Sequence, residues 1–372
     1  MLQNKIYQNF SFEILKNFSI ILFGLSIIAL TARAVNFLDL IVDNGYPVRI
    51  YLQYCILNLF GIAPKFIPLS FLISLTIFIL KHINDSEFVI LWTSGVKKIQ
   101  IVNLFIFTSV IILVFNLVLS ILLTPSALNK SRQLLSQDEL NSFLPTIRSQ
   151  QFSDSFKGFT FIVENKSKNE LKNIFLFDIG GNLSKLSSNI SNTHSTTIIA
   201  EKGIAETNKL ILFNGQIISS KKDELENEII KFEQINIDLK ELTTRTIKQV
   251  KIQETPTFEL TKCLFDKNSE LKICKGDSYK EIIPVLIRRM VLPLYVPVIT
   301  LICSLLLFKS NRFFLNKYSV FFYSFILLVI TELIIRFTGI NNLLRYFYII
   351  FPFIALFLLY LLLVFKSSRE VK

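Results

Sequence analysis

Apolar residues are concentrated in two blocks of the chain, roughly 14–123 and 285–365, and a polar segment separates them. Six apolar stretches lie in these blocks, at about 15–36, 52–80, 99–123, 287–308, 318–337 and 346–365. Each approaches or exceeds the ~20 residues that an α-helix needs to cross the hydrocarbon core of a bilayer. The pattern therefore predicts six transmembrane helices, three on each side of the polar segment.

Between about residues 146 and 239 the pattern changes to short β-like runs separated by turn residues. The runs are 159–164, 174–179, 196–201, 210–213 and 229–239. In the last run apolar and polar residues roughly alternate, as in a strand with one buried face. Many short antiparallel strands are typical of a sandwich or jelly roll. The predicted fold is an α-helical membrane protein with an inserted all-β jelly-roll domain.

The same pattern predicts the domain boundaries. Residues 1–123 hold the first three membrane helices, with a short surface helix at about 84–97. Residues 124–284 form the β domain with its linkers, and residues 285–372 hold the last three membrane helices and a tail.

Composition and charge indicate the class of protein and its orientation in the membrane. The chain is 51% hydrophobic and carries a formal net charge of +12. The excess positive charge lies beside the membrane spans, which argues against a nucleic-acid partner. One set of loops is rich in lysine, for example at Lys81, Lys97 and Lys98, whereas the opposite short loops carry Asp39 and Asp43. Positively charged loops stay in the cytoplasm. We therefore expect both termini in the cytoplasm and the β domain on the outer side of a multi-pass membrane protein.

Residues that could carry catalysis are scarce. The two histidines, His82 and His194, have no partner at metal-ligand spacing, and no phosphate-binding loop of the GxxxxGK[ST] type is present. The sequence therefore predicts no catalytic residue, no metal site and no bound cofactor. We interpret His82 as an interfacial polar residue. Cys263 and Cys274 are candidates for a disulfide if their segment faces an oxidising periplasm.

A short amphipathic helix is expected between the second and third spans. Asn84, Asp85 or Ser86 could cap its start, acidic residues including Glu87 suit its first turn, and Gly95 could cap its end. Phe88, Leu91 and Trp92 fall on one face. This helix is expected at the cytoplasmic surface, either as a simple interfacial anchor or as a contact for a partner protein.

This segment resembles the coupling-helix motif of the LptF/LptG lipopolysaccharide-export permeases. The similarity is carried by Ser86-Glu87-Phe88, Leu91 and Ser94-Gly95-Val96, and the order of spans and β domain matches over nearly the whole chain. Two positions depart from the motif: Trp92 replaces a common basic residue and Lys97 replaces a small hydroxyl. The resemblance implies that Ser86, Glu87, Phe88, Leu91, Trp92 and Gly95 dock onto an LptB-type ATPase dimer, which uses the ATP.

The resemblance also implies a bacterial inner-membrane location, lipopolysaccharide as the cargo, and further partners. These are a homologous LptG-type permease and periplasmic jelly-roll proteins of the LptC and LptA type. The stretches 159–164 and 171–178 are closer to an LptF-type than to an LptG-type chain. Inward residues of the β domain, such as Phe161 and Ile235, are then candidates for a lipid path.

Charged residues inside membrane spans are costly and are functional candidates by default. The candidates for contact with a lipid headgroup are Arg33, Arg288, Arg289 and Arg336. Arg33 matches a basic position that the LptF/LptG family uses near the headgroup. The alternative is snorkelling or internal pairing, for example of Glu332 with Arg336.

Two other functions remain open at this point. The first is a membrane-anchored assembly protein that transmits force from an ATPase to the β domain without moving lipid. The second is a membrane enzyme, which the shortage of histidines and clustered acids disfavours.

Overall fold

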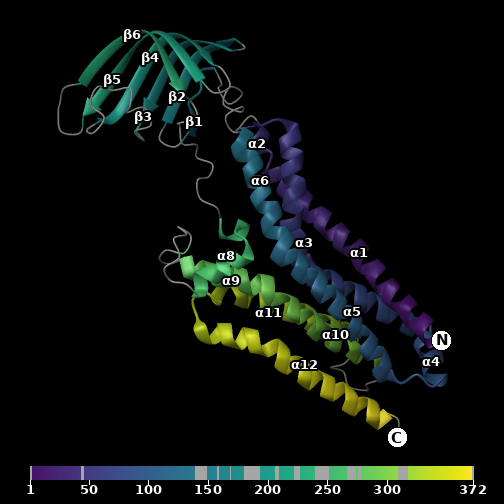
Figure 1. Cartoon of the computed structure of the whole chain (residues 1–372). Coiled ribbons are helices and arrows are strands. Elements are labelled where there is room, and N and C mark those ends of the chain that lie inside the picture. The colour runs from purple at the N-terminus through teal and green to yellow at the C-terminus, as the bar shows by residue number, and fades with distance from the viewer. Residues whose placement is uncertain are drawn as a thin grey trace. The chain divides into compact units, whose positions relative to one another are not determined.

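The computed structural model describes residues 2–42, 46–138, 149–156, 159–167, 169–179, 193–205, 209–221, 227–238, 251–265, 274, 278–308 and 317–370. The chain divides into two compact units, and each is described by itself. The first comprises Met1–Ala32, Leu57–Asn129 and Val250–Lys372. The second comprises Arg33–Ile56 and Lys130–Gln249. Figure 1 labels the elements of both units.

The helices have these bounds in chain order: α1 (Leu2–Asn36), α2 (Asp39–Val42), α3 (Val48–Asn84), α4 (Glu87–Thr93), α5 (Lys98–Val118), η1 (Leu119–Leu123), α6 (Thr124–Asp138), η4 (Ile252–Glu254), α8 (Thr257–Phe265), α9 (Ser278–Met290), η6 (Leu292–Leu294), α10 (Tyr295–Ser304), η7 (Leu305–Leu307), α11 (Lys317–Phe337) and α12 (Asn342–Glu370).

Six helical spans of the described chain are long and apolar enough to cross a membrane. They are Lys5–Ile41, Val48–Asn84, Lys98–Leu135, Lys280–Leu307, Tyr318–Phe337 and Asn342–Arg369. Each contains or closely matches one of the predicted stretches, so the prediction of a six-helix membrane protein is confirmed. Most extend beyond the predicted ends, because polar residues continue the helix past the apolar stretch.

The third and fourth spans depart from regular α-helix. The third passes through the π-helical turn η1 between α5 and α6. The fourth is interrupted by the 3-10 turn η6, which contains Pro293, and it ends in a second 3-10 turn, η7. A proline lacks the backbone N–H that a regular helix needs, which explains the break at η6. By contrast, α3 stays helical across Pro64 and Pro68.

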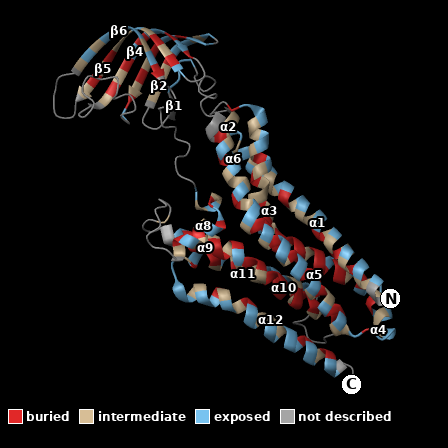
Figure 2. Ribbon diagram, viewed as in Figure 1, coloured by how far each residue is buried: buried red, intermediate tan, exposed pale blue. Residues whose placement is uncertain are grey.

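The core of the helical unit is built from α3, α5 and α10, together with the first half of α1. Phe71, Leu75, Phe78, Phe105 and Ile299 are fully buried in one cluster. Figure 2 shows α9 and α10 mostly buried, whereas α1 and α12 are largely exposed. In a membrane protein such apolar outer faces lie against lipid or against another subunit.

The β domain is a six-stranded antiparallel sheet whose strands follow one another in chain order. The strands are β1 (Ser153–Phe156), β2 (Phe159–Ser167), β3 (Glu170–Asp178), β4 (Thr193–Ala205), β5 (Lys209–Lys221) and β6 (Asn227–Asp238). The inserted β domain is therefore confirmed. Among the described strands the connectivity is that of a meander in one sheet, and not the Greek-key connection of two sheets expected for a jelly roll.

One row of residues bends this sheet across five strands, and we call it the crease. The crease residues are Glu164, Asn173, Glu201, Asn214 and Glu233, which the flanking strand pairs place opposite one another. Asn173 and Asn214 adopt left-handed backbone conformations, each with a φ of 50°. Asparagine tolerates this region better than most residues.

The crease changes which residues of each strand face the core. In β3 the buried positions are Leu171, Ile174 and Leu176, so the alternation slips by one residue at Asn173. The same slip separates Ala200 from Gly203 in β4 and Leu212 from Gly215 in β5. A strand normally turns alternate side chains to one face. Each of these strands therefore has one extra residue at the crease. This extra residue keeps the apolar face on the same side of the sheet beyond the bend.

Residues from both sides of the crease form one buried cluster, which includes Phe161, Ile174, Ile198, Leu210 and Ile237. Gly203 allows close packing at the bend, because a Cβ there would lie 2.5 Å from Cδ1 of Ile174. The predicted jelly roll thus takes the form of a single bent sheet with a continuous apolar face, which is visibly arched in Figure 1.

Candidate functional site

The helix α4 begins and ends through local backbone geometry. Ser86 occupies the N-cap in a left-handed conformation, and its side chain makes no capping hydrogen bond. At the other end the Gly95 N–H donates to the Trp92 carbonyl, and the Val96 N–H donates to the Leu91 carbonyl. This is a Schellman ending, which requires a residue with positive φ. Gly95 supplies it with a φ of 91°, one position beyond the C-cap Ser94.

The face of α4 that carries Phe88, Leu91 and Trp92 packs against the chain's own helices. Phe88 is 1% exposed and meets Phe10 and Phe78 edge-on. Leu91 and Trp92 border the same core cluster. The face predicted to contact a partner is therefore turned mainly inward.

The outward face of α4 is also apolar. Val89 is 50% exposed and Ile90 is 65% exposed. Sequence reasoning missed these two residues because it assigned a single apolar face. The available signal was that α4 reads Glu-Phe-Val-Ile-Leu-Trp-Thr, which is apolar nearly all round. An all-round apolar helix has contacts on more than one side.

Trp92, the chain's one tryptophan, is held between two neighbours. Its ring stacks on Phe88 with centroids 6.2 Å apart, and Nζ of Lys98 lies 4.5 Å from the indole centroid. The ammonium over the indole face forms a cation–π contact. Trp92 therefore fixes α4 against the start of α5.

A charged cluster joins α4 to α1 and α3. Nε2 of His82 lies 3.2 Å from Oε2 of Glu87 and 3.5 Å from Oε2 of Glu13. Nδ1 of His82 lies 2.9 Å from the Phe78 carbonyl, and Nζ of Lys81 lies 2.8 Å from Oε1 of Glu13. His82 is only 2% exposed, so the predicted interfacial residue is a buried junction between three helices. This junction was not predictable from the sequence, because Glu13 and Lys81 are 68 residues apart.

A groove of about 400 Å³ runs between the start of α1 and α4. It is lined by Lys5, Ile6, Asn9, Phe10, Glu87, Ile90 and Leu91. Its walls therefore combine exposed apolar surface with a carboxylate that is 46% exposed. This mixture suits a protein contact better than a small-molecule site.

The membrane cations have different environments. Nη2 of Arg288 lies 2.7 Å from Oε2 of Glu332, so Glu332 pairs with Arg288 and not with Arg336. Arg289 is buried and donates to the carbonyls of Gln253 and Thr255 and to the Thr257 hydroxyl. Its donors hold the segment at the start of α8, so this guanidinium is not available to a lipid headgroup.

Arg336 and Arg33 are exposed. Arg336 borders a groove of about 290 Å³ between α3 and α11, which also contains Lys65 and Glu332. The remaining wall is mainly apolar and includes Phe66, Leu69, Phe325, Leu328, Val329 and Leu333. A cationic rim beside an apolar wall matches the chemistry of an anionic lipid. Arg33 belongs to the other compact unit.

In the β domain, Phe161 is 2% exposed and Ile235 packs against the same buried cluster. Both side chains lie on the apolar face of the bent sheet.

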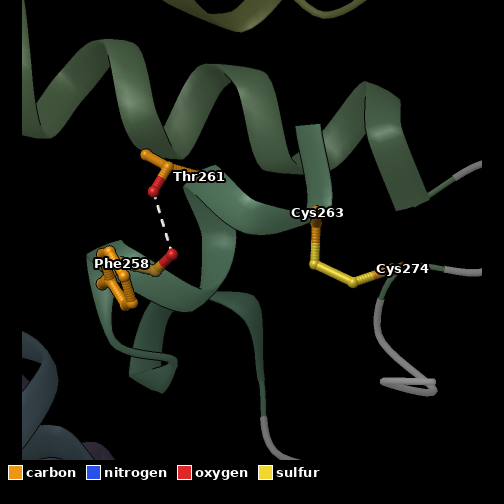
Figure 3. Close-up of a disulfide and its surroundings, with 4 residues drawn as sticks. All are labelled: Phe258, Thr261, Cys263 and Cys274. Atoms are coloured by element: carbon orange, nitrogen blue, oxygen red, sulfur yellow. Dashed lines mark hydrogen bonds between the residues drawn. A yellow bond between two sulfur atoms is a disulfide. The ribbon is translucent and has the colours of Figure 1, made fainter. Parts of the chain in front are cut away.

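Cys263 of α8 and Cys274 are joined by a disulfide, with Cα atoms 5.4 Å apart (Figure 3). Cys263 packs with Leu260, Ile282 and Leu286, so the bond lies beside the contact between α8 and α9. Among the described residues, no group of three or more His, Cys, Asp or Glu side chains could hold a metal ion.

A family model described as the lipopolysaccharide export system permease LptF/LptG matches residues 10–367. None of the curated proteins matches the chain. The family match covers four of the six membrane spans completely, most of the first and last spans, and the intervening β domain. This chain therefore belongs to the LptF/LptG family of lipopolysaccharide export permeases, a family of inner-membrane, multi-pass transporter subunits.

Proposed function

We propose that this chain is the LptF-type half of an ABC exporter that extracts lipopolysaccharide from the inner membrane. A homologous LptG-type permease would form the other half, and an LptB-type ATPase dimer would supply the energy. The cargo would pass to periplasmic proteins of the LptC and LptA type. Family membership implies a permease, and the exposed apolar face of α4 is the observation that supports coupling to a cytoplasmic partner.

The proposed orientation follows the loop charges. Lys81, Lys97 and Lys98 flank α4, and this concentration of positive charge favours the cytoplasm. The β domain then lies in the periplasm, where the disulfide between Cys263 and Cys274 is chemically compatible with the compartment.

For coupling, we propose that Glu87, Val89 and Ile90 contact the ATPase. Phe88 and Trp92 would support α4 without contacting the ATPase, because they pack α4 against α1, α3 and α5. Movement of the ATPase would then be transmitted to three helices through one short element.

For cargo binding, we propose that Arg336 and Arg33 meet lipid phosphates while the groove beside α11 takes acyl chains. Guanidinium groups bind phosphate through paired hydrogen bonds. Arg288 would contribute chiefly by holding Glu332 in the groove wall, since their side chains are already paired.

The coupling proposal is tested by exchanging Ile90 for serine in the full chain. Ile90→Ser should lower co-purification of the ATPase about tenfold, because a central apolar contact is worth roughly 1–2 kcal/mol. Ile354→Ser is the matched control, since Ile354 is 53% exposed on α12 and far along the chain from α4. Glu87→Lys should also weaken the complex. Equal co-purification by both α4 variants and the control would overturn the assignment.

A further inference from the structure

A cavity of about 70 Å³ lies inside the helical unit, between α3, the η1 region and α9. Its wall includes Asn116, Ser120, Thr124 and Gln253. All of the ionisable side chains in the wall are cations, namely Lys65, Arg288 and Arg289. The cavity is therefore electropositive, although most of its wall is apolar.

The charge of Arg289 is the first indication of a ligand. Arg289 is 5% exposed, and its three hydrogen bonds all go to neutral oxygens, two carbonyls and one hydroxyl. The neighbouring Arg288 is already paired with Glu332. A buried charge without a counterion is costly. Among the described residues, the wall of the cavity thus holds no negative charge opposite Arg289.

Unpaired donors are the second, independent indication. Nδ2 of Asn116 and Nε of Arg288 are both buried and have no hydrogen-bond partner among the residues that the structure describes. Asn116 is 1% exposed, and its Oδ1 accepts a hydrogen bond from Ser120 at 3.2 Å, which leaves the amide nitrogen as the available group. Buried donors are nearly always satisfied in folded proteins. Both donors belong to residues of the cavity wall.

We propose that this cavity binds a small inorganic anion of chloride size, held by Asn116 Nδ2, Arg288 Nε and the charge of Arg289. A water molecule needs only about 10–15 Å³ of such volume, so the cavity accepts one small ion with some water but not a sugar phosphate. The anion supplies both missing partners at once, namely an acceptor for the donors and a charge for Arg289.

The position of the site gives the anion a structural consequence. Arg289 holds the segment from Gln253 to Thr257, and the Thr257 hydroxyl donates to the Ile121 carbonyl of η1 at 3.1 Å. The π-helical turn η1 also contains Ser120, which bonds Asn116. π-Helical turns are frequent at functional sites. The bound anion therefore stabilises the junction between η1 and the segment that precedes α8.

Anomalous scattering tests the site directly. Crystals of the full chain grown in bromide should show an anomalous peak in this cavity, within hydrogen-bond distance of Asn116 Nδ2 and Arg288 Nε. In solution, replacing chloride by gluconate at constant ionic strength should lower the midpoint temperature of unfolding. Bromide should restore it. An empty anomalous map together with a midpoint that ignores the anion would show a water-filled cavity and overturn the proposal.

A pair of variants on α5 separates the site from general salt effects. Asn116→Leu should raise the half-saturating chloride concentration about tenfold, which corresponds to the loss of one hydrogen bond to a charged group. Asn103→Leu is the matched control, because Asn103 is exposed on the same helix and outside the cavity wall. An equal response of the two variants contradicts the assignment. Stabilisation by phosphate but by no halide also contradicts it.

Discussion

At the scale of single residues, the junction around His82 explains how a seven-residue helix is held in place. Nδ1 of His82 can donate to the Phe78 carbonyl only when it carries a proton. Nε2 faces carboxylates from α1 and α4. The imidazole ring therefore links Glu13 and Glu87 to the end of α3.

Replacing His82 tests this junction. His82→Leu should lower the stability of the α4 region by about 1–3 kcal/mol, because a leucine side chain cannot hydrogen-bond to the Phe78 carbonyl or to the two carboxylates. His82→Gln should lose less, since its amide can still donate. The fluorescence of Trp92, the chain's single tryptophan, reports local detachment of α4 during unfolding of the full chain. Identical unfolding curves for the two variants and the wild type would mean that the cluster contributes nothing.

The sequence alone could not predict which distant residues a given side chain contacts. Arg289 was a candidate headgroup ligand because the hydropathy pattern predicts that it lies inside a membrane span. Its hydrogen-bond acceptors at Gln253, Thr255 and Thr257 lie more than 30 residues away in the chain. The pairing of Arg288 with Glu332 joins residues 44 positions apart. Hydropathy predicts how deep in the membrane such charges lie, but it does not predict which residues they contact.

At the scale of elements, the spans were predictable because a bilayer imposes length and hydropathy on each helix independently. The orientation of α4 was not predictable, since both of its faces are apolar and only the packing of the helix decides which face is buried. The strands were located by their apolar runs. The crease was not predicted, because it depends on five strands carrying an extra residue at the same register.

The crease predicts a specific response at Asn214. Asn214→Val should lower the stability of the β domain by about 1–2 kcal/mol, because a β-branched residue is disfavoured in the left-handed region. Asn214→Gly should be tolerated. Gln216→Val serves as the control, since position 216 lies on the same strand outside the left-handed positions. Denaturant unfolding of the full chain, followed by β-sheet circular dichroism, measures the difference. Equal effects of the two valine variants would contradict the account.

At the scale of the whole molecule, the helical unit and the bent sheet present the two environments that an amphiphilic cargo requires. The groove beside Arg336 combines cations with apolar wall, and the sheet carries a continuous apolar face. Lipid transport and simple transmission of force differ in whether cargo reaches that face.

Photocrosslinking decides between these two functions. Benzophenone side chains at Phe161 and Ile235 should capture lipopolysaccharide in cells, because both positions lie on the apolar face. The same group at Ile199, which is 39% exposed on β4, is the matched control and should remain largely unlabelled. Labelling that is absent at both inward positions, or equal at all three, would favour a protein that transmits force without carrying lipid.

The bend of the sheet has a consequence for sequence change. Deleting Asn214 alone would remove the extra residue from β5, so that unbroken alternation would carry Leu210, Leu212 and Ile217 on one face without the bend. The neighbouring strands would keep their extra residue, so the deleted strand could match them on one side of the bend only. The number of residues at the crease must therefore match in all five strands. Insertions and deletions should accumulate in the connections between strands and be excluded from the crease.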